Sequence, residues 1–199
     1  MSARGRRRIT VEALVPAPVE EVWARSLDHR RHLLWDIRFD EIHARPAADG
    51  RGYAELAYRT RLGFGLRIEG TGRYLGRREG AVCSFEFGSE DPRSLIAEGK
   101  GAWIYRPAEE GRTHFRTVYD YRVRYRALGQ AADRVFRPVM QLATEWSFET
   151  LRRWCGGDEV ALARRRNRWR FLPFLFRRLV GAQPALGEAK SWIGEEAGS

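Results

Sequence analysis

The chain has 199 residues, 43% of them hydrophobic and 12% aromatic, which is enough for one sizeable hydrophobic core. Its 36 basic residues outnumber its 26 acidic residues and give a formal net charge of +10, so we expect an attraction to phosphate-bearing surfaces. Two cysteines without a CxxC pair, no secretory signal and no apolar run near the roughly 20 residues of a membrane span predict a cytoplasmic protein, either soluble or peripheral at the inner membrane face.

The first 36 residues predict a strand followed by two short helices. Residues 9–15 place apolar side chains at every second position, which is typical of a strand. Two prolines end that strand and open a helix whose apolar residues recur at helical spacing through Leu27. Asp28 is then the expected N-cap of a second helix, which closes at Trp35-Asp36.

The middle of the chain predicts strands separated by turn residues. With the first strand they form a meander of about seven strands. The further strands are expected at residues 37–44, 53–60, 64–75, 81–87, 95–106 and 113–125. Glycines within residues 64–75 indicate a bend or bulge, as a strongly curved sheet requires.

The last of these strands alternates most strictly. Its enclosed face carries Tyr119, Tyr121 and Tyr125, so that face is apolar in bulk but dotted with hydroxyl groups. Each buried hydroxyl needs a partner or costs roughly 1 to 3 kcal/mol. One interpretation is an internal cavity for a partly polar organic molecule, and the other is a core whose tyrosine tips reach the barrel rim.

A long amphipathic helix follows directly. Its apolar stripe runs from Val135 to Trp154, and Gly156-Gly157 ends it. Pro138 either kinks this helix or marks its first turn.

This order of elements resembles the START and polyketide-cyclase superfamily, also called SRPBCC. The residues that carry the likeness are Val15-Pro16-Ala17-Pro18-Val19-Glu20-Glu21-Val22-Trp23, then Trp35-Asp36, then Glu145-Trp146-Ser147-Phe148-Glu149-Thr150-Leu151. The likeness spans about Arg8 to Cys155. It implies an α+β helix-grip fold, in which a curved antiparallel sheet wraps around a long C-terminal helix. We therefore expect a ligand-binding domain at residues 1–156 and a basic, aromatic extension at residues 157–199.

The resemblance also implies a hydrophobic tunnel between sheet and helix that holds lipid- or polyketide-like molecules. We expect binding or carriage of such a ligand, with no cofactor. The alternatives are a polyketide cyclase or aromatase that uses the same cavity, and a regulatory module without a ligand. The residues expected in the cavity wall are Phe64, Phe85, Trp103, Phe115, Tyr119, Tyr121, Tyr125, Val139, Ala143 and Trp146.

Few residues suggest catalysis. The candidates are the inward hydroxyls of Tyr119, Tyr121 and Tyr125, with Asp36 as an acid near the cavity mouth. We favour the tyrosines as cavity wall and expect binding without turnover. His29 and His32 stand three apart on a helix, but no cysteine or third histidine is near them in the sequence, so we expect no metal site.

The extension places bulky apolar residues among arginines, a composition that suits a segment lying in a membrane interface. The residues expected to contact an anionic membrane are Arg164, Arg165, Arg166, Arg168, Trp169, Phe171, Phe174, Phe176, Arg177 and Arg178. The alternative is that these aromatic residues pack back on the domain. Nucleic acid is the least favoured partner, because no recognition module is present.

Overall fold

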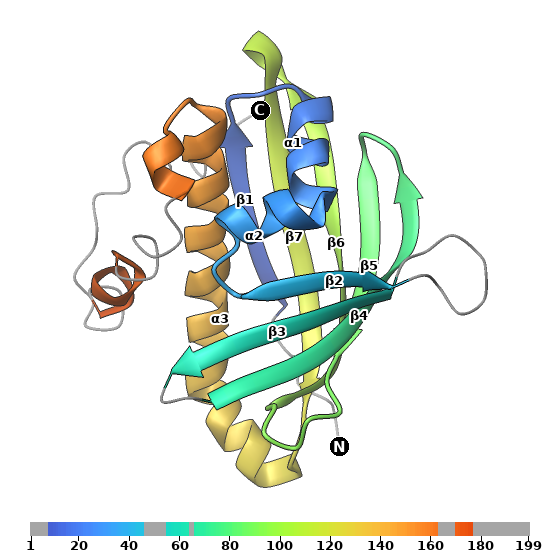
Figure 1. Cartoon of the computed structure of the whole chain (residues 1–199), viewed down its shortest axis with the longest axis vertical. Coiled ribbons are helices and arrows are strands. Elements are labelled where there is room, and N and C mark those ends of the chain that lie inside the picture. Colours follow the sequence, from blue (N-terminus) through green and yellow to red (C-terminus); the bar gives the residue numbers. More distant parts are fainter. Residues whose placement is uncertain (1–7, 46–54, 64–65, 163–169, 177–199) are drawn as a thin grey trace, which may run out of the picture.

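The structure is a computed structural model that describes residues 8–45, 55–63, 66–162 and 170–176 (Figure 1). Its elements in chain order are β1 (Ile9–Val15), α1 (Val19–Leu27), α2 (His29–Trp35), β2 (Glu41–Arg45), β3 (Glu55–Gly63), β4 (Leu66–Arg78), β5 (Val82–Gly88), β6 (Ile96–Ala108), η1 (Glu109–Gly111), β7 (Arg112–Val123), α3 (Arg126–Cys155) and η2 (Glu159–Leu162). Residues 170–176 are also helical.

The strands form one sheet in the order β1-β7-β6-β5-β4-β3-β2, and every neighbouring pair is antiparallel. From β2 to β7 each strand pairs with the next one in the sequence. The last strand, β7, also pairs with the first, β1, so that Tyr119 lies opposite Ile9. In Figure 1, β2, β3 and β4 cross the molecule at a steep angle to β1 and β7, and α3 runs along the enclosed side. This confirms the predicted helix-grip fold.

Glycines on the sheet let aromatic rings lie across neighbouring strands. A Cβ atom added at Gly101 would lie 2.5 Å from the Tyr119 Cβ and 2.6 Å from the Val118 carbonyl oxygen. A Cβ at Gly99 would lie 2.8 Å from both a Phe87 ring carbon and the Asp120 carbonyl oxygen. These positions accept no side chain without movement of the neighbouring strand. Register shifts in β3, β4 and β6 add further bending.

One end of the space between sheet and α3 is filled by stacked aromatic rings. Phe115 on β7 lies parallel to Phe148 on α3, with ring centroids 4.6 Å apart, and its other face stacks on Tyr105 at 4.7 Å. Trp35 meets the edge of Phe148 at 6.1 Å. All four side chains are buried, so they form the solid core of the domain.

The helix boundary at Asp28 is as predicted, whereas the start of β2 is not. The Asp28 carboxylate accepts hydrogen bonds from the backbone N–H groups of Arg30 and Arg31, both at 2.9 Å. The predicted strand from residue 37 begins only at Glu41. The reason is that the Asp36 side chain accepts the backbone N–H of Arg38 at 3.0 Å, which forms a turn and withholds that group from a strand ladder.

The prediction for the end of β7 is wrong in one respect. β7 stops at Val123, and Tyr125 adopts a left-handed conformation with φ 65° as the residue before α3. Alternation therefore ends before Tyr125, which is 51% exposed instead of enclosed. Pro138 lies within α3, and the first turns of the helix are angled away from the rest in Figure 1. Pro138 therefore does not mark the first turn of α3, which begins twelve residues earlier at Arg126.

Candidate functional site

A cavity of about 720 Å³ lies between the β2–β5 half of the sheet and α3. Its volume falls within the range of about 300–1,000 Å³ that is usual for small-molecule sites. Its wall is mainly apolar and includes Tyr58, Tyr74, Phe85, Phe87, Trp103 and Met140. The cavity therefore suits a ligand with a large apolar surface.

The structure places half of the expected wall residues at this cavity. Phe85, Trp103, Tyr119, Val139 and Ala143 line it. Phe64 lies outside the described residues.

The other four expected wall residues lie elsewhere, because each has a different partner. Phe115 belongs to the solid core. Tyr121 donates its hydroxyl to Asp133 at 2.7 Å. Tyr125 is exposed and donates to the Pro92 carbonyl.

Trp146 is the fourth, and it packs against the C-terminal segment. Its ring lies 5.1 Å from Phe174 and 6.3 Å from Phe171. The apolar residues of α3 thus fall into two groups: some face the sheet, and Trp146 packs against residues 170–176.

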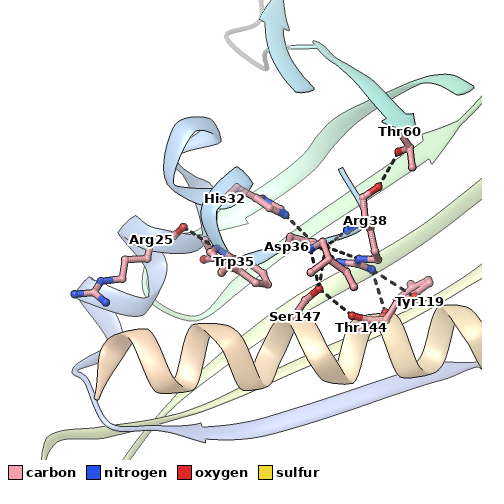
Figure 2. Close-up of polar contacts among 12 residues, drawn as sticks. Arg25, His32, Trp35, Asp36, Arg38, Thr60, Tyr119, Thr144 and Ser147 are labelled. Atoms are coloured by element: carbon pink, nitrogen blue, oxygen red, sulfur yellow. Dashed lines mark hydrogen bonds and ion pairs between the residues drawn. The ribbon is translucent and has the colours of Figure 1, made fainter. Parts of the chain in front are cut away.

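The polar side of the cavity is built on an ion pair between Asp36 and Arg38 (Figure 2). The Arg38 Nε donates to Asp36 Oδ1 at 2.9 Å, and Nη2 donates to Oδ2 at 2.6 Å. The Ser147 hydroxyl of α3 also contacts Oδ1, at 3.1 Å. Asp36 is 1% exposed, and Arg38 lines the cavity with 13% of its side chain exposed.

Arg38 extends this network to β7 and α3. Its Nη1 lies 3.2 Å from the Thr144 hydroxyl and 3.4 Å from the Tyr119 hydroxyl. The Thr144 hydroxyl donates to the Met140 carbonyl at 2.7 Å. Tyr119 must therefore donate its own proton to Thr144, 2.7 Å away. Figure 2 shows these groups converging from the α2–β2 turn, β7 and α3.

The network fixes the protonation states of its members. Burial disfavours a charged Asp36, but the adjacent Arg38 guanidinium outweighs that cost and holds the pKa of this carboxyl well below its usual range. Burial likewise disfavours a charged Arg38, but the adjacent Asp36 carboxylate outweighs that cost and raises the pKa of Arg38 above its usual value. Burial raises the pKa of Tyr119, so its hydroxyl stays protonated at neutral pH. The site thus contains one buried pair of opposite charges and a neutral phenol.

Two histidines of α2 also line the cavity. His32 stacks on Trp35 with ring centroids 4.8 Å apart, and its Nε2 lies 2.9 Å from Asp36 Oδ2. Because the ionised carboxylate only accepts, Nε2 carries the proton. The Nδ1 atom of His29 is buried and has no hydrogen-bond partner within the described ranges. Burial lowers the pKa of His29 and favours its neutral form.

No group of three possible metal ligands among histidine, cysteine, aspartate and glutamate gathers anywhere in the described part of the chain. His29 and His32 both line the cavity, and Asp36, the carboxylate beside His32, is paired with Arg38.

Residues 170–176 lie beside the cavity. Phe171 and Leu172 line it, Phe174 is buried against Trp146, and Phe176 is 69% exposed. The other residues expected to contact a membrane lie outside the described residues; they are Arg164, Arg165, Arg166, Arg168, Trp169, Arg177 and Arg178. Within the described ranges, no helix has both the length and the apolar composition needed to cross a bilayer.

Comparison with known proteins gives one related sequence and many similar folds. No protein-family model matches the chain. The chain is 37% identical over 156 residues to the uncharacterized membrane protein YndG of Bacillus subtilis (strain 168), which covers 73% of this chain and 56% of that protein. The chain thus spans little more than half the length of this curated relative.

Solved structures share the architecture at low sequence identity. TTHA0849 from Thermus thermophilus is 15% identical with a TM-score of 0.61, over 77% of this chain and 99% of that chain. The Zhui aromatase/cyclase from Streptomyces sp. R1128 is 15% identical with a TM-score of 0.62, over 75% and 93%. The chain has the helix-grip fold. Ara h 8.0201 shares this fold at 10% identity and a TM-score of 0.57, over 76% of this chain and 99% of that chain.

Proposed function

We propose that the protein binds and carries a hydrophobic or amphipathic small molecule in the cavity between the sheet and α3. The observation that carries the proposal is a cavity of about 720 Å³, lined mainly by apolar side chains, beside a fully packed core. Empty apolar volume forfeits dispersion contacts, so a cavity of this size costs stability unless a ligand fills it.

A pair of valine substitutions on α3 tests this proposal. Val139 lines the cavity, whereas Val135 lies one turn earlier and is 68% exposed. We expect the wild-type chain to bind a neutral apolar dye, Val139→Trp to lose most of that binding, and Val135→Trp to retain it. Equal binding by all three proteins would contradict the proposal. Native mass spectrometry of freshly purified protein gives a second readout, a copurified mass of lipid size.

A cyclase-type enzyme is the second candidate, favoured by one observation. His32 and Tyr119 present two groups capable of proton transfer at the same cavity as Arg38. Fold similarity to the Zhui aromatase/cyclase adds nothing about chemistry at 15% identity. Turnover of a polyketide-like substrate that disappears in Tyr119→Phe while binding persists would favour the enzyme. Unchanged turnover in that variant would exclude this role for Tyr119.

We also propose that residues 170–176 touch an anionic membrane at the cavity mouth. Leu172 and Phe176 are exposed large apolar side chains, and Arg170 beside them is exposed. Seven arginines and tryptophan flank or enter this segment in the sequence. The relative from Bacillus subtilis is named a membrane protein, which supports this location. Exposed apolar side chains next to arginine suit an interfacial segment.

Flotation with vesicles of phosphatidylglycerol and phosphatidylcholine tests the membrane proposal. We expect the wild-type chain to float at low salt and the double variant Leu172→Ser/Phe176→Ser to remain largely in solution. The control is Leu128→Ser, because this leucine at the start of α3 is even more exposed than Leu172. If the double variant floats as well as the wild type, residues 170–176 have no part in membrane contact.

A further inference from the structure

Arg38 lines the cavity and has one N–H group without a hydrogen-bond partner among the described residues. Four of its five N–H groups have partners: Nε and one Nη2 hydrogen bind Asp36, and the two Nη1 hydrogens face Tyr119 and Thr144. The second Nη2 hydrogen has no partner among the described residues. At 3.4 Å, the contact from Nη1 to Tyr119 is longer than the usual range for such a bond.

The geometry of the guanidinium shows where that donor points. Asp36 occupies the edge formed by Nε and Nη2, because both atoms donate to its two oxygens. The free Nη2 hydrogen therefore belongs to the other edge, which it shares with one of the two Nη1 hydrogens. Two parallel N–H groups on one edge match the two oxygens of a carboxylate. Arg38 and Tyr119 both line the cavity.

The charges around the cavity favour an anion. Arg38, Arg61 and Arg93 line it, against one acid, Glu69. Glu69 is paired with Arg59 at 2.8 Å, and Arg61 and Arg93 also have acidic partners. Arginines therefore outnumber acids in the cavity wall, and the net charge of +10 also favours an anion.

We propose that the ligand is an amphipathic carboxylate whose head group binds the open edge of Arg38. This inference rests on the proposed ligand-binding function and specifies its ligand class. The apolar tail then lies along Phe85, Phe87 and Tyr74 of the sheet. A phosphate dianion fits less well, because Asp36 places a fixed negative charge on the other edge of the same guanidinium.

Matched ligands test the inference on the wild-type chain. Oleic acid and methyl oleate have the same tail and differ in the charge of the head group. Each is used to displace a neutral apolar dye, below the concentration at which it aggregates. We expect oleic acid to bind at least about tenfold more tightly, since a hydrogen bond to a charged group contributes about 1.5–3 kcal/mol. Equal affinities would overturn the carboxylate proposal while leaving the cavity function intact, and failure of the dye itself to bind would count against both.

Variants locate the head group. The double variant Asp36→Asn/Arg38→Gln removes both buried charges together, and we expect it to bind the dye while losing the preference for the acid. The control is Arg122→Gln, because Arg122 lies outside this cavity, is 60% exposed and is paired with Glu98. We expect this variant to keep the preference. Loss of the preference in Arg122→Gln, or its persistence in the double variant, would overturn the assignment to Arg38. The wild-type comparison decides the ligand class even if the double variant does not fold.

Discussion

The two ends of the space between sheet and helix are built from the same elements but filled differently. Toward the C-terminal half of α3, Phe115 is stacked between Tyr105 and Phe148 with no room to spare. Farther toward the N-terminus of α3, glycines and register shifts bend the sheet away, and Val139 and Ala143 are too short to fill the gap. The stable core and the candidate site are thus neighbouring regions of one fold. Side chains that border the cavity make fewer van der Waals contacts than those in the core and so contribute less to stability.

β7 shows this division within a single strand. Its inward residues pass from Thr113, which donates to the Ala17 carbonyl at 2.7 Å, through Phe115 in the core to Tyr119 at the cavity. Tyr121 follows and is tied to Asp133. Each of these hydroxyls has a protein partner, so the hydroxyl-rich face stabilises the fold in addition to lining the site.

Replacing one aromatic ring by alanine at each end should give the largest difference in the free energy of unfolding. We expect Phe148→Ala to lower the free energy of unfolding by about 3–5 kcal/mol, because it opens a void in close-packed surroundings. Phe85 already borders the cavity and contacts Trp103 at 5.3 Å, so Phe85→Ala should cost about half as much. Urea unfolding at pH 7 measures both, and equal losses would show that the hollow end is packed like the core.

The buried ion pair should come next. Asp36→Ala leaves the Arg38 charge buried without its partner, and we expect a loss of about 3–5 kcal/mol. The control is Glu98→Ala, which breaks an exposed pair with Arg122 and should cost less than about 1 kcal/mol. If Asp36→Ala unfolds at the same urea concentration as the wild type, the pair contributes nothing to stability.

The same pair should make stability depend on acid. The pKa of Asp36 is lower in the folded chain than in the unfolded chain, so the unfolded chain binds more protons as the pH falls. The contribution of Asp36 is complete above its unfolded pKa of about 3.9 and is lost as the pH falls toward the folded value. Unfolding followed from pH 6 to pH 2 should show a shallower loss for Asp36→Asn/Arg38→Gln than for the wild type. An identical slope would contradict the lowered pKa.

A smaller effect is expected from filling the sheet. Gly101→Ala would push a methyl group against Tyr119 and the Val118 carbonyl, and overpacking of this kind costs about 1–3 kcal/mol. Gly76→Ala is the matched control on β4, because a Cβ there meets nothing within 4 Å. We expect Gly101→Ala to unfold at a lower temperature than Gly76→Ala. Equal behaviour would show that the bent sheet has room beside Tyr119.

Most elements could be predicted because their hydrophobic periods are long and unbroken. The ends of β3 and β4 lie three residues beyond their predicted positions, and two other boundaries were missed for identifiable reasons. Alternation continued formally to Tyr125, although the chain had already turned into α3. The start of β2 depended on a side chain, since Asp36 forms a turn within a segment of strand-like composition.

Arg38 was missed for a related reason. In the predicted strand it was one of many arginines, and nothing near it in the sequence distinguished it. Its contacts to Tyr119 and Thr144 join residues 81 and 106 positions away, which no local pattern reveals. The spacing of four between His32 and Asp36 was the one available signal, since it places both side chains on the same side of α2.

The smallest expected effect compares two tyrosines of β7. Tyr121→Phe removes one hydroxyl from Asp133, which still accepts from Arg137 at 3.0 Å, so the loss should be about 1 kcal/mol. Ligand binding should not change, because Tyr121 lies outside the cavity between sheet and helix. Tyr119→Phe should cost a similar amount but also alter binding, because Tyr119 lines the cavity beside Arg38. Dye titration of both variants measures the difference, and equal effects on binding would mean that the division along β7 has no functional consequence.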